Sequence, residues 1–245
     1  MRSKSTAWYS VIVFAAFMAA SFCLPSLVQA LTIVDTGSSS TSGTAGYVLS
    51  SSQSRQSYSS YRFANWLSAE FNVAQESTIT DIQGWMSLRA SYIPYGQTTY
   101  GNTFAIAIYG DGGEVPNVSN PLLYQTFTID RSTVNVADWR GLSGLSLDLA
   151  AGDYWVAFEV PAFVNGVANN TWGVMPNNPI VPNPLNNAAY LSSYYGNVWQ
   201  ASDSTKFGVR ILALDPPPSV PEPATMLLLG FGLAGLAGVS RKFKK

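Results

Sequence analysis

The chain has 245 residues, of which 47% are hydrophobic and 11% are charged, and its formal net charge is −1. It contains no histidine, which excludes a Ser-His-Asp triad, histidine acid–base catalysis and histidine-ligated zinc. Residues 31–220 hold seven basic and thirteen acidic side chains, a formal charge of −6, and this acidic balance argues against a nucleic-acid partner.

The first thirty residues have the layout of a secretory signal peptide. Arg2 and Lys4 precede a mostly apolar run, and small residues follow that run. Val28 and Ala30 occupy positions −3 and −1 before Leu31, so we expect cleavage between Ala30 and Leu31. The alternative for the same pattern is an N-terminal membrane anchor that is never cut.

Cleavage at this point removes Cys23, the only cysteine of the chain. The exported domain, residues 31–214, then has no disulfide, no thiolate and no cysteine metal ligand. It must be stabilised by burial of its apolar side chains, and its length is sufficient for one domain with a sizeable core.

The exported domain reads as a series of short β-strands. After a Ser/Thr/Gly-rich segment with one strand at 47–49, apolar and polar residues alternate with a period of two, which is typical of half-buried strands. Such strands are predicted at 67–73, 79–88, 104–109, 122–129, 145–150, 154–160, 190–199 and 207–212. Turn residues at 110–117, a tight hairpin at 150–153 and a Pro/Asn loop at 175–187 separate them. The pattern predicts an all-β fold, an antiparallel, jelly-roll-like sandwich.

No catalytic, cofactor or metal site is predicted in this domain. The stretch 111–114, Asp-Gly-Gly-Glu, lacks the spacing of a calcium loop and reads as a turn. Glu70 and Glu159 lie on polar strand faces, and a carboxylate pair is the minimum for a glycosidase, but the sequence does not give their separation.

Aromatic residues in an Asn-rich region offer a candidate glycan contact. The rings of Trp172, Tyr194, Tyr195 and Trp199 could stack on sugar faces, while amides bind hydroxyls. The alternative is that these rings pack in the core or at its rim.

The last part of the chain has three consecutive features. Residues 215–223 are a proline-rich spacer that ends in Pro221-Glu222-Pro223, and residues 224–240 are uncharged. As a helix, that run spans about 25 Å, near the lower limit for a transmembrane helix. A basic tail, 241–245, follows with Arg241, Lys242, Lys244 and Lys245, which should stay cytoplasmic.

The run also contains a G-x-G-x-x-G pattern at 230–235, as in dinucleotide-binding loops. The strand, the βαβ unit and the later acidic residue that a nucleotide site needs are missing, so we expect no cofactor.

The Pro-Glu-Pro triplet, the uncharged run and the basic tail follow one another at the end of the chain. In this order they closely resemble the PEP-CTERM sorting signal of Gram-negative bacteria. The resemblance implies export through the Sec machinery, transient anchoring in the inner membrane and processing by an exosortase. It also implies a final place at the cell surface or in an extracellular polysaccharide or biofilm matrix. The stretches 67–85, 108–117 and 149–159 look like β-sandwich domains often found ahead of such tails, which implies the sandwich alone.

From these features we expect an exported, surface-sorted, non-enzymatic protein associated with extracellular polysaccharide. A carbohydrate-binding module is the first alternative, and a carboxylate-dependent glycosidase is the second.

Overall fold

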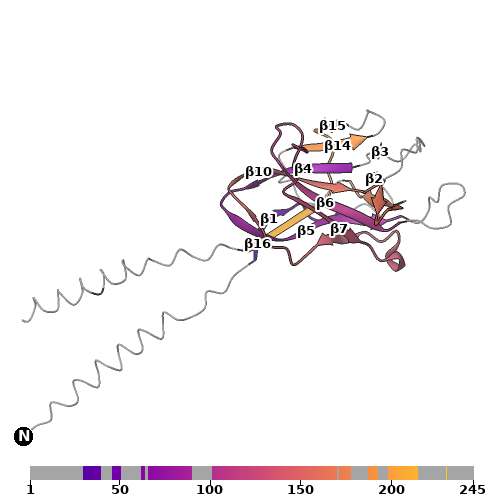
Figure 1. The fold of residues 1–245 in the computed structure, drawn as a ribbon, viewed down its shortest axis with the longest axis horizontal. Helices are drawn as coiled ribbons and strands as arrows, with labels where there is room; N and C mark the ends of the chain where they lie inside the picture. The colour runs from indigo at the N-terminus through magenta and orange to yellow at the C-terminus, as the bar shows by residue number, and fades with distance from the viewer. Residues whose placement is uncertain are drawn as a thin grey trace, which may run out of the picture. The chain divides into compact units, whose positions relative to one another are not determined.

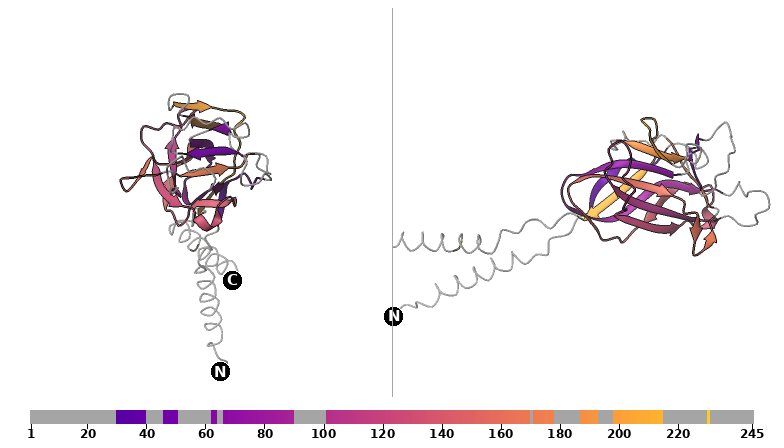
Figure 2. Two further views of the ribbon diagram at one scale, coloured as in Figure 1. Left: turned by 90° about the vertical axis from the view of Figure 1, so that its right-hand side faces the viewer. Right: turned by 45° about the horizontal axis from the view of Figure 1, so that its top comes forward.

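The computed structural model describes residues 30–39, 46–50, 62–63, 66–89, 101–169, 171–177, 187–192, 198–214 and 230. Gln29–Asp215 form a compact unit of β-strands, in which two sheets pack face to face (Figures 1 and 2). The predicted all-β sandwich is confirmed.

One sheet has eight strands, and the twelve-residue strand β5 (Ser77–Leu88) runs through its centre. Strand β16 pairs with one edge of β5, while β9, β8 and β13 pair in succession with the other edge. The pairs are antiparallel except β2 with β3. The other members are β1 (Ala30–Asp35), β2 (Tyr47–Ser50), β3 (Arg62–Phe63), β8 (Asp138–Leu142), β9 (Leu147–Leu149), β13 (Trp172–Met175) and β16 (Val209–Leu214).

The second sheet has six antiparallel strands in the order β15-β14-β4-β10-β6-β7. A short hairpin, β11 with β12, and a 3₁₀ helix, Arg131–Thr133, complete the described elements of the domain. The strand bounds are β4 (Trp66–Val73), β6 (Thr103–Gly110), β7 (Leu123–Thr128), β10 (Gly152–Glu159), β11 (Phe163–Val164), β12 (Val167–Ala168), β14 (Ala188–Ser192) and β15 (Val198–Ala201).

The core lies between the two sheets and is built from the residues that the alternation pattern assigned to one strand face. On β4 these are Leu67, Ala69, Phe71 and Val73, all of which are buried. They pack with inward residues of β6, β10, β5 and β16 in one continuous cluster. Burial of these apolar side chains stabilises the sandwich, because each removes apolar surface from water.

The opposite face of the six-stranded sheet is also buried, which the alternation pattern did not predict. Ser68, Ala107 and Ala157 point away from the core, yet none is accessible to solvent. The two alanines belong with Tyr109, Trp155, Trp199 and neighbouring residues to one buried cluster that combines large aromatic and small side chains.

Two strand predictions are wrong. The turn 150–153 does not close a hairpin, because β9 pairs with β5 in one sheet whereas β10 pairs with β4 and β6 in the other. The single strand predicted over 190–199 is two strands, β14 and β15, which pair with each other. Strands β1, β3, β8, β11, β12 and β13 were not predicted.

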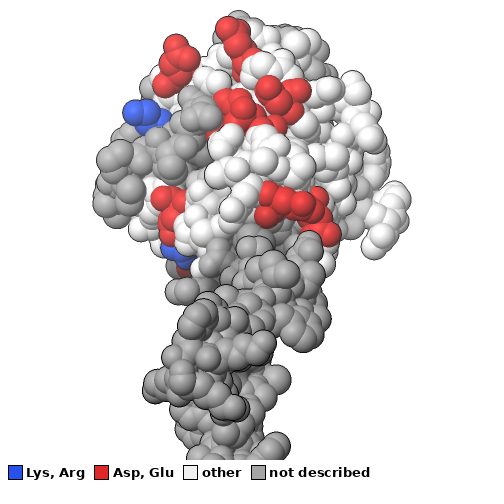
Figure 3. All heavy atoms as spheres, turned by 90° about the vertical axis from the view of Figure 1, so that its left-hand side faces the viewer, with Lys and Arg blue, Asp and Glu red and all other residues white. Residues whose placement is uncertain are grey.

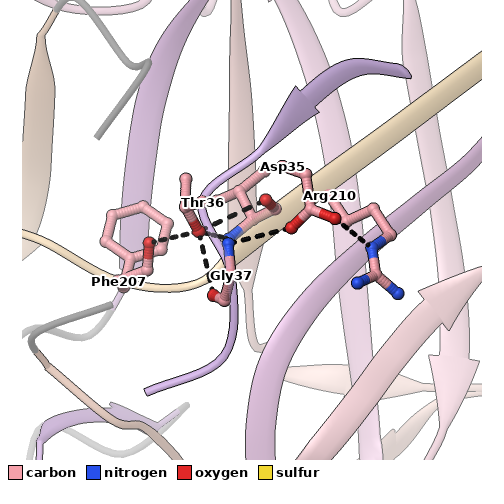
Figure 4. Close-up of polar contacts among 6 residues, drawn as sticks. Asp35, Thr36, Gly37, Phe207 and Arg210 are labelled. Atoms are coloured by element: carbon pink, nitrogen blue, oxygen red, sulfur yellow. Dashed lines mark hydrogen bonds and ion pairs between the residues drawn. The ribbon is translucent and has the colours of Figure 1, made fainter. Parts of the chain in front are cut away.

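The first and last strands of the domain close the eight-stranded sheet. Ala30 pairs with Leu214, so both ends of the domain lie side by side, and β16 lies between β1 and β5. Further contacts lie beyond the ladder: the buried Thr36 Oγ1 accepts a hydrogen bond from the Val209 N–H at 2.8 Å. Figure 4 shows the Thr36 hydroxyl beside the main-chain carbonyl of Phe207. The Asp35 carboxylate accepts from the Gly37 N–H at 2.8 Å.

The predictions for the flanking segments fall almost entirely outside the described residues. This holds for the signal helix within 1–30, the spacer 215–223, the transmembrane helix 224–240 and the tail 241–245, apart from Ala30 and Gly230. Ala30 is the first residue of β1. Among the described residues, no helix has both the length and the apolarity needed to span a bilayer.

Candidate functional site

The outer face of the six-stranded sheet brings together three of the residues that the sequence singled out: Glu70, Glu159 and Trp199. The register places Glu70 of β4 opposite Trp155 of β10, and Trp155 opposite Tyr109 of β6. We call this surface, with its two glutamates, the carboxylate face. Trp172 lies on β13 in the other sheet and is not part of it.

Glu159 is the last residue of β10, and only 2% of its surface is exposed. The Tyr109 hydroxyl donates a hydrogen bond to its Oε1 at 2.8 Å. Burial raises the pKa of Glu159 from its ordinary value of 4.5 to about 7, and the bond from Tyr109 opposes this increase. The pKa of Tyr109 is raised in turn by its own burial and by the negative charge of Glu159.

Glu70 is the second buried carboxylate of this face, with 7% of its surface exposed. The Asn187 Nδ2 donates to its Oε2 at 2.6 Å, and the Glu70 N–H donates to the Asn187 carbonyl at 2.9 Å. Burial raises the pKa of Glu70, while the hydrogen bond from Asn187 lowers it.

The two carboxyl groups of this face have separate hydrogen-bond partners. Glu159 lies four residues beyond Trp155, which is the residue opposite Glu70, so the two main chains are roughly 13 Å apart along the strands. Moreover, Glu159 bonds to Tyr109 on one side of β10 and Glu70 bonds to Asn187 on the far side of β4, so the groups turn away from each other.

The aromatic residues predicted to contact glycans are largely buried where the structure describes them. Trp172 is 6% exposed and Trp199 is 8% exposed, and Trp199 packs against Trp66 with ring centroids 6.4 Å apart. Stacking on a sugar needs an accessible ring face, so these two tryptophans have the packing role that was the alternative for them. Tyr194 and Tyr195 lie outside the described residues.

Two residues of the carboxylate face were missed by sequence reasoning. Tyr109 is the hydrogen-bond donor to Glu159, and Trp155 is fully buried between Glu70 and Tyr109. The Trp155 indole N–H has no hydrogen-bond partner in the described part of the chain. The alternation pattern does place both side chains on the outer face, which is the signal that could have found them.

The end of the domain where β1 begins and β16 ends is acidic. Figure 3 shows Asp and Glu side chains over this end, and the exposed ones at its strand ends and connections include Glu76, Asp111, Asp148 and Asp153. The Asp111 carboxylate accepts from the Gly113 N–H at 2.7 Å, which confirms the predicted turn. Within the described ranges, no group of three or more His, Cys, Asp or Glu side chains is placed to hold a metal ion.

The sorting residues Pro221, Glu222, Pro223, Arg241, Lys242, Lys244 and Lys245, and Val28 of the predicted cleavage site, lie outside the described residues. Leu31, the residue after that cleavage site, pairs with Ala213 inside the sheet.

Comparison with protein families matches residues 219–242 to the PEP-CTERM protein-sorting motif. Neither the search of curated proteins nor the search of solved structures gave a match. The matched segment covers the Pro-Glu-Pro triplet, the uncharged run and the start of the basic tail, and it begins after Leu214, the last residue of β16. The motif implies export, sorting to the surface and an exosortase as processing partner. The chain thus carries a PEP-CTERM protein-sorting motif at residues 219–242.

Proposed function

We propose that the protein is an exported, non-enzymatic component of an extracellular polysaccharide or biofilm matrix. The Sec machinery would translocate the chain, and signal cleavage would then leave Leu31 as its N-terminal residue. The run 224–240 would hold the protein in the inner membrane until an exosortase acts. The observation that carries the proposal is the sorting motif at 219–242.

The architecture of the domain supports this order of events. The last strand ends at Leu214, ahead of the matched segment, so processing in that segment leaves every described strand intact. The first strand begins where signal cleavage is predicted, so the chain between the two processing points corresponds to the folded unit Gln29–Asp215. A non-enzymatic role is favoured because the described carboxylates diverge and histidine is absent.

Fractionation of the native host tests the proposal. We expect a shortened product to be recovered with the extracellular polysaccharide, and we expect the full-length chain to accumulate in the membrane fraction when the exosortase is deleted. Glu222→Ala should behave like the deletion, whereas Glu114→Ala, a change at an exposed residue of the domain, should not. Full-length chain in the cytosol would refute export, and a processed product free of polysaccharide would refute matrix association.

A further inference from the structure

The outer face of the eight-stranded sheet carries a cluster of aromatic and polar side chains that remains partly exposed. Trp85 of β5 lies opposite Trp139 of β8, and Gln83 of β5 lies opposite Arg210 of β16. Asp81 is two residues before Gln83 on the same face. We call these five residues the Trp–Arg patch, and each of them is half-buried.

Arg210 is held in a fixed orientation by two contacts. Its Nε donates to the Asp35 carboxylate at 3.0 Å, as Figure 4 shows, and its guanidinium lies 4.1 Å from the ring centroid of Trp139. Trp139 in turn meets Trp85 edge to face, with centroids 5.6 Å apart and an interplanar angle of 69°. Because only Nε is engaged, the two terminal nitrogens of Arg210 have no hydrogen-bond partner among the described residues.

The patch also contains other unused hydrogen-bonding groups. The amide of Gln83 and the carboxylate of Asp81 make no side-chain hydrogen bond within the described ranges. The indole N–H of Trp85 is buried and, in the same part of the chain, has no acceptor. A buried donor without an acceptor is costly, so a ligand or water oxygen at this position would be stabilising.

We propose that the Trp–Arg patch binds a neutral sugar unit of a polysaccharide. The exposed parts of the half-buried indole rings offer apolar surface for the C–H groups of a pyranose, and the two terminal nitrogens of Arg210 can donate to its hydroxyls. The Gln83 amide can donate to or accept from the hydroxyls at the ring edge, and the Asp81 carboxylate accepts from them. The nature of the polymer, an extracellular polysaccharide, rests on the proposed function; the site itself rests on the geometry.

The charges of the domain decide between a neutral and an anionic sugar. Asp35 already compensates the charge of Arg210, and Asp81 adds a further negative charge to the patch. The sequence between 31 and 220 has a formal charge of −6. A uronate-containing polymer would therefore be repelled as it approaches, whereas a neutral polymer carries no such penalty.

Affinity electrophoresis of the full-length chain in a sugar-free zwitterionic detergent tests the proposal. The probes are dextran and galactomannan as neutral polymers, and alginate and polygalacturonate as uronate polymers. We expect retardation by at least one neutral polymer, with binding about tenfold weaker in Trp139→Ala and about fivefold weaker in Gln83→Ala. Tyr124→Ala, which removes a 48% exposed aromatic ring from the other sheet, is the matched control and should bind as the parent does.

Each other outcome overturns the assignment. Equal binding by the parent, Trp139→Ala and Gln83→Ala would show that the contact lies elsewhere, and retardation only by uronate polymers would refute the neutral ligand. No retardation by any polymer would refute glycan binding at the patch. Gln83→Ala keeps the comparison valid if Trp139→Ala fails to fold, because the Gln83 side chain makes no hydrogen bond among the described residues. The two proposals can fail separately. If no polymer binds at the patch but the host still yields a processed product associated with polysaccharide, the proposed function stands and only the binding site is refuted.

Discussion

The buried carboxyl of Glu159 should make the stability of the domain depend on pH. Its pKa is raised from 4.5 to about 7 in the folded state, because burial penalises the charged form. The folded state therefore binds the proton more tightly than the unfolded state, and the free energy of unfolding falls as pH rises from about 4.5 to 7. At about 1.4 kcal/mol for each tenfold difference in proton affinity, the fall amounts to roughly 3 kcal/mol.

Glu159→Gln should remove most of this dependence, since an amide does not titrate. The amide leaves a buried N–H₂ group without an acceptor, so the variant is expected to be less stable than the parent at pH 5 by about 1–3 kcal/mol. The informative quantity is thus the change in stability with pH and not its absolute value. A small decline should persist in the variant, because burial also raises the pKa of Glu70.

Urea unfolding followed by tryptophan fluorescence at several pH values between 4.5 and 8.5 measures this difference. Glu76→Gln, a change at an exposed residue of the β4–β5 turn, is the matched control and should decline in parallel with the parent. A parent whose stability is flat across this range, or a Glu159→Gln variant with the same decline as the parent, would refute the reasoning.

Three further predictions concern packing, closure and processing. Thr36→Val leaves the buried Val209 N–H without its acceptor and should cost about 1–3 kcal/mol in urea unfolding, whereas Thr32→Val, on the exposed side of β1, should change stability by less than about 0.5 kcal/mol. Phe158→Ala removes a fully buried ring between the sheets and should cost about 3–5 kcal/mol by the same assay; a loss below 1 kcal/mol would contradict the described core. Glu222→Ala should abolish C-terminal processing in host cells, so that the decrease in mass that accompanies processing is no longer seen. Unchanged processing would show that the exosortase does not need the Pro-Glu-Pro triplet.

The sequence predicts the inner faces of the strands well because burial imposes a period of two on them. Leu67, Ala69, Phe71 and Val73 alternate with polar residues, and they do point into the core. Strand β8, Asp-Trp-Arg-Gly-Leu, lacks that alternation and is held by its register with β5, so no local pattern predicts it.

The errors come from pairings between distant residues. The turn chemistry at 150–153 is real, but a turn does not tell whether its flanking strands pair with each other or diverge into two sheets. Likewise, Glu70 is buried with Asn187, 117 positions away, and Glu159 with Tyr109, 50 positions away. The sequence correctly predicts that both glutamates lie on the outer strand faces. It does not predict that they are buried, because the residues that contact them are distant in the sequence.

The two ends of the mature protein test the central claim most directly. Mass spectrometry of the protein recovered from the host's surface or matrix should give Leu31 as the N-terminal residue and a C-terminus at or near Pro221–Pro223. Intact protein with both Met1 and Lys245, recovered from the cytosol, would contradict export and processing together.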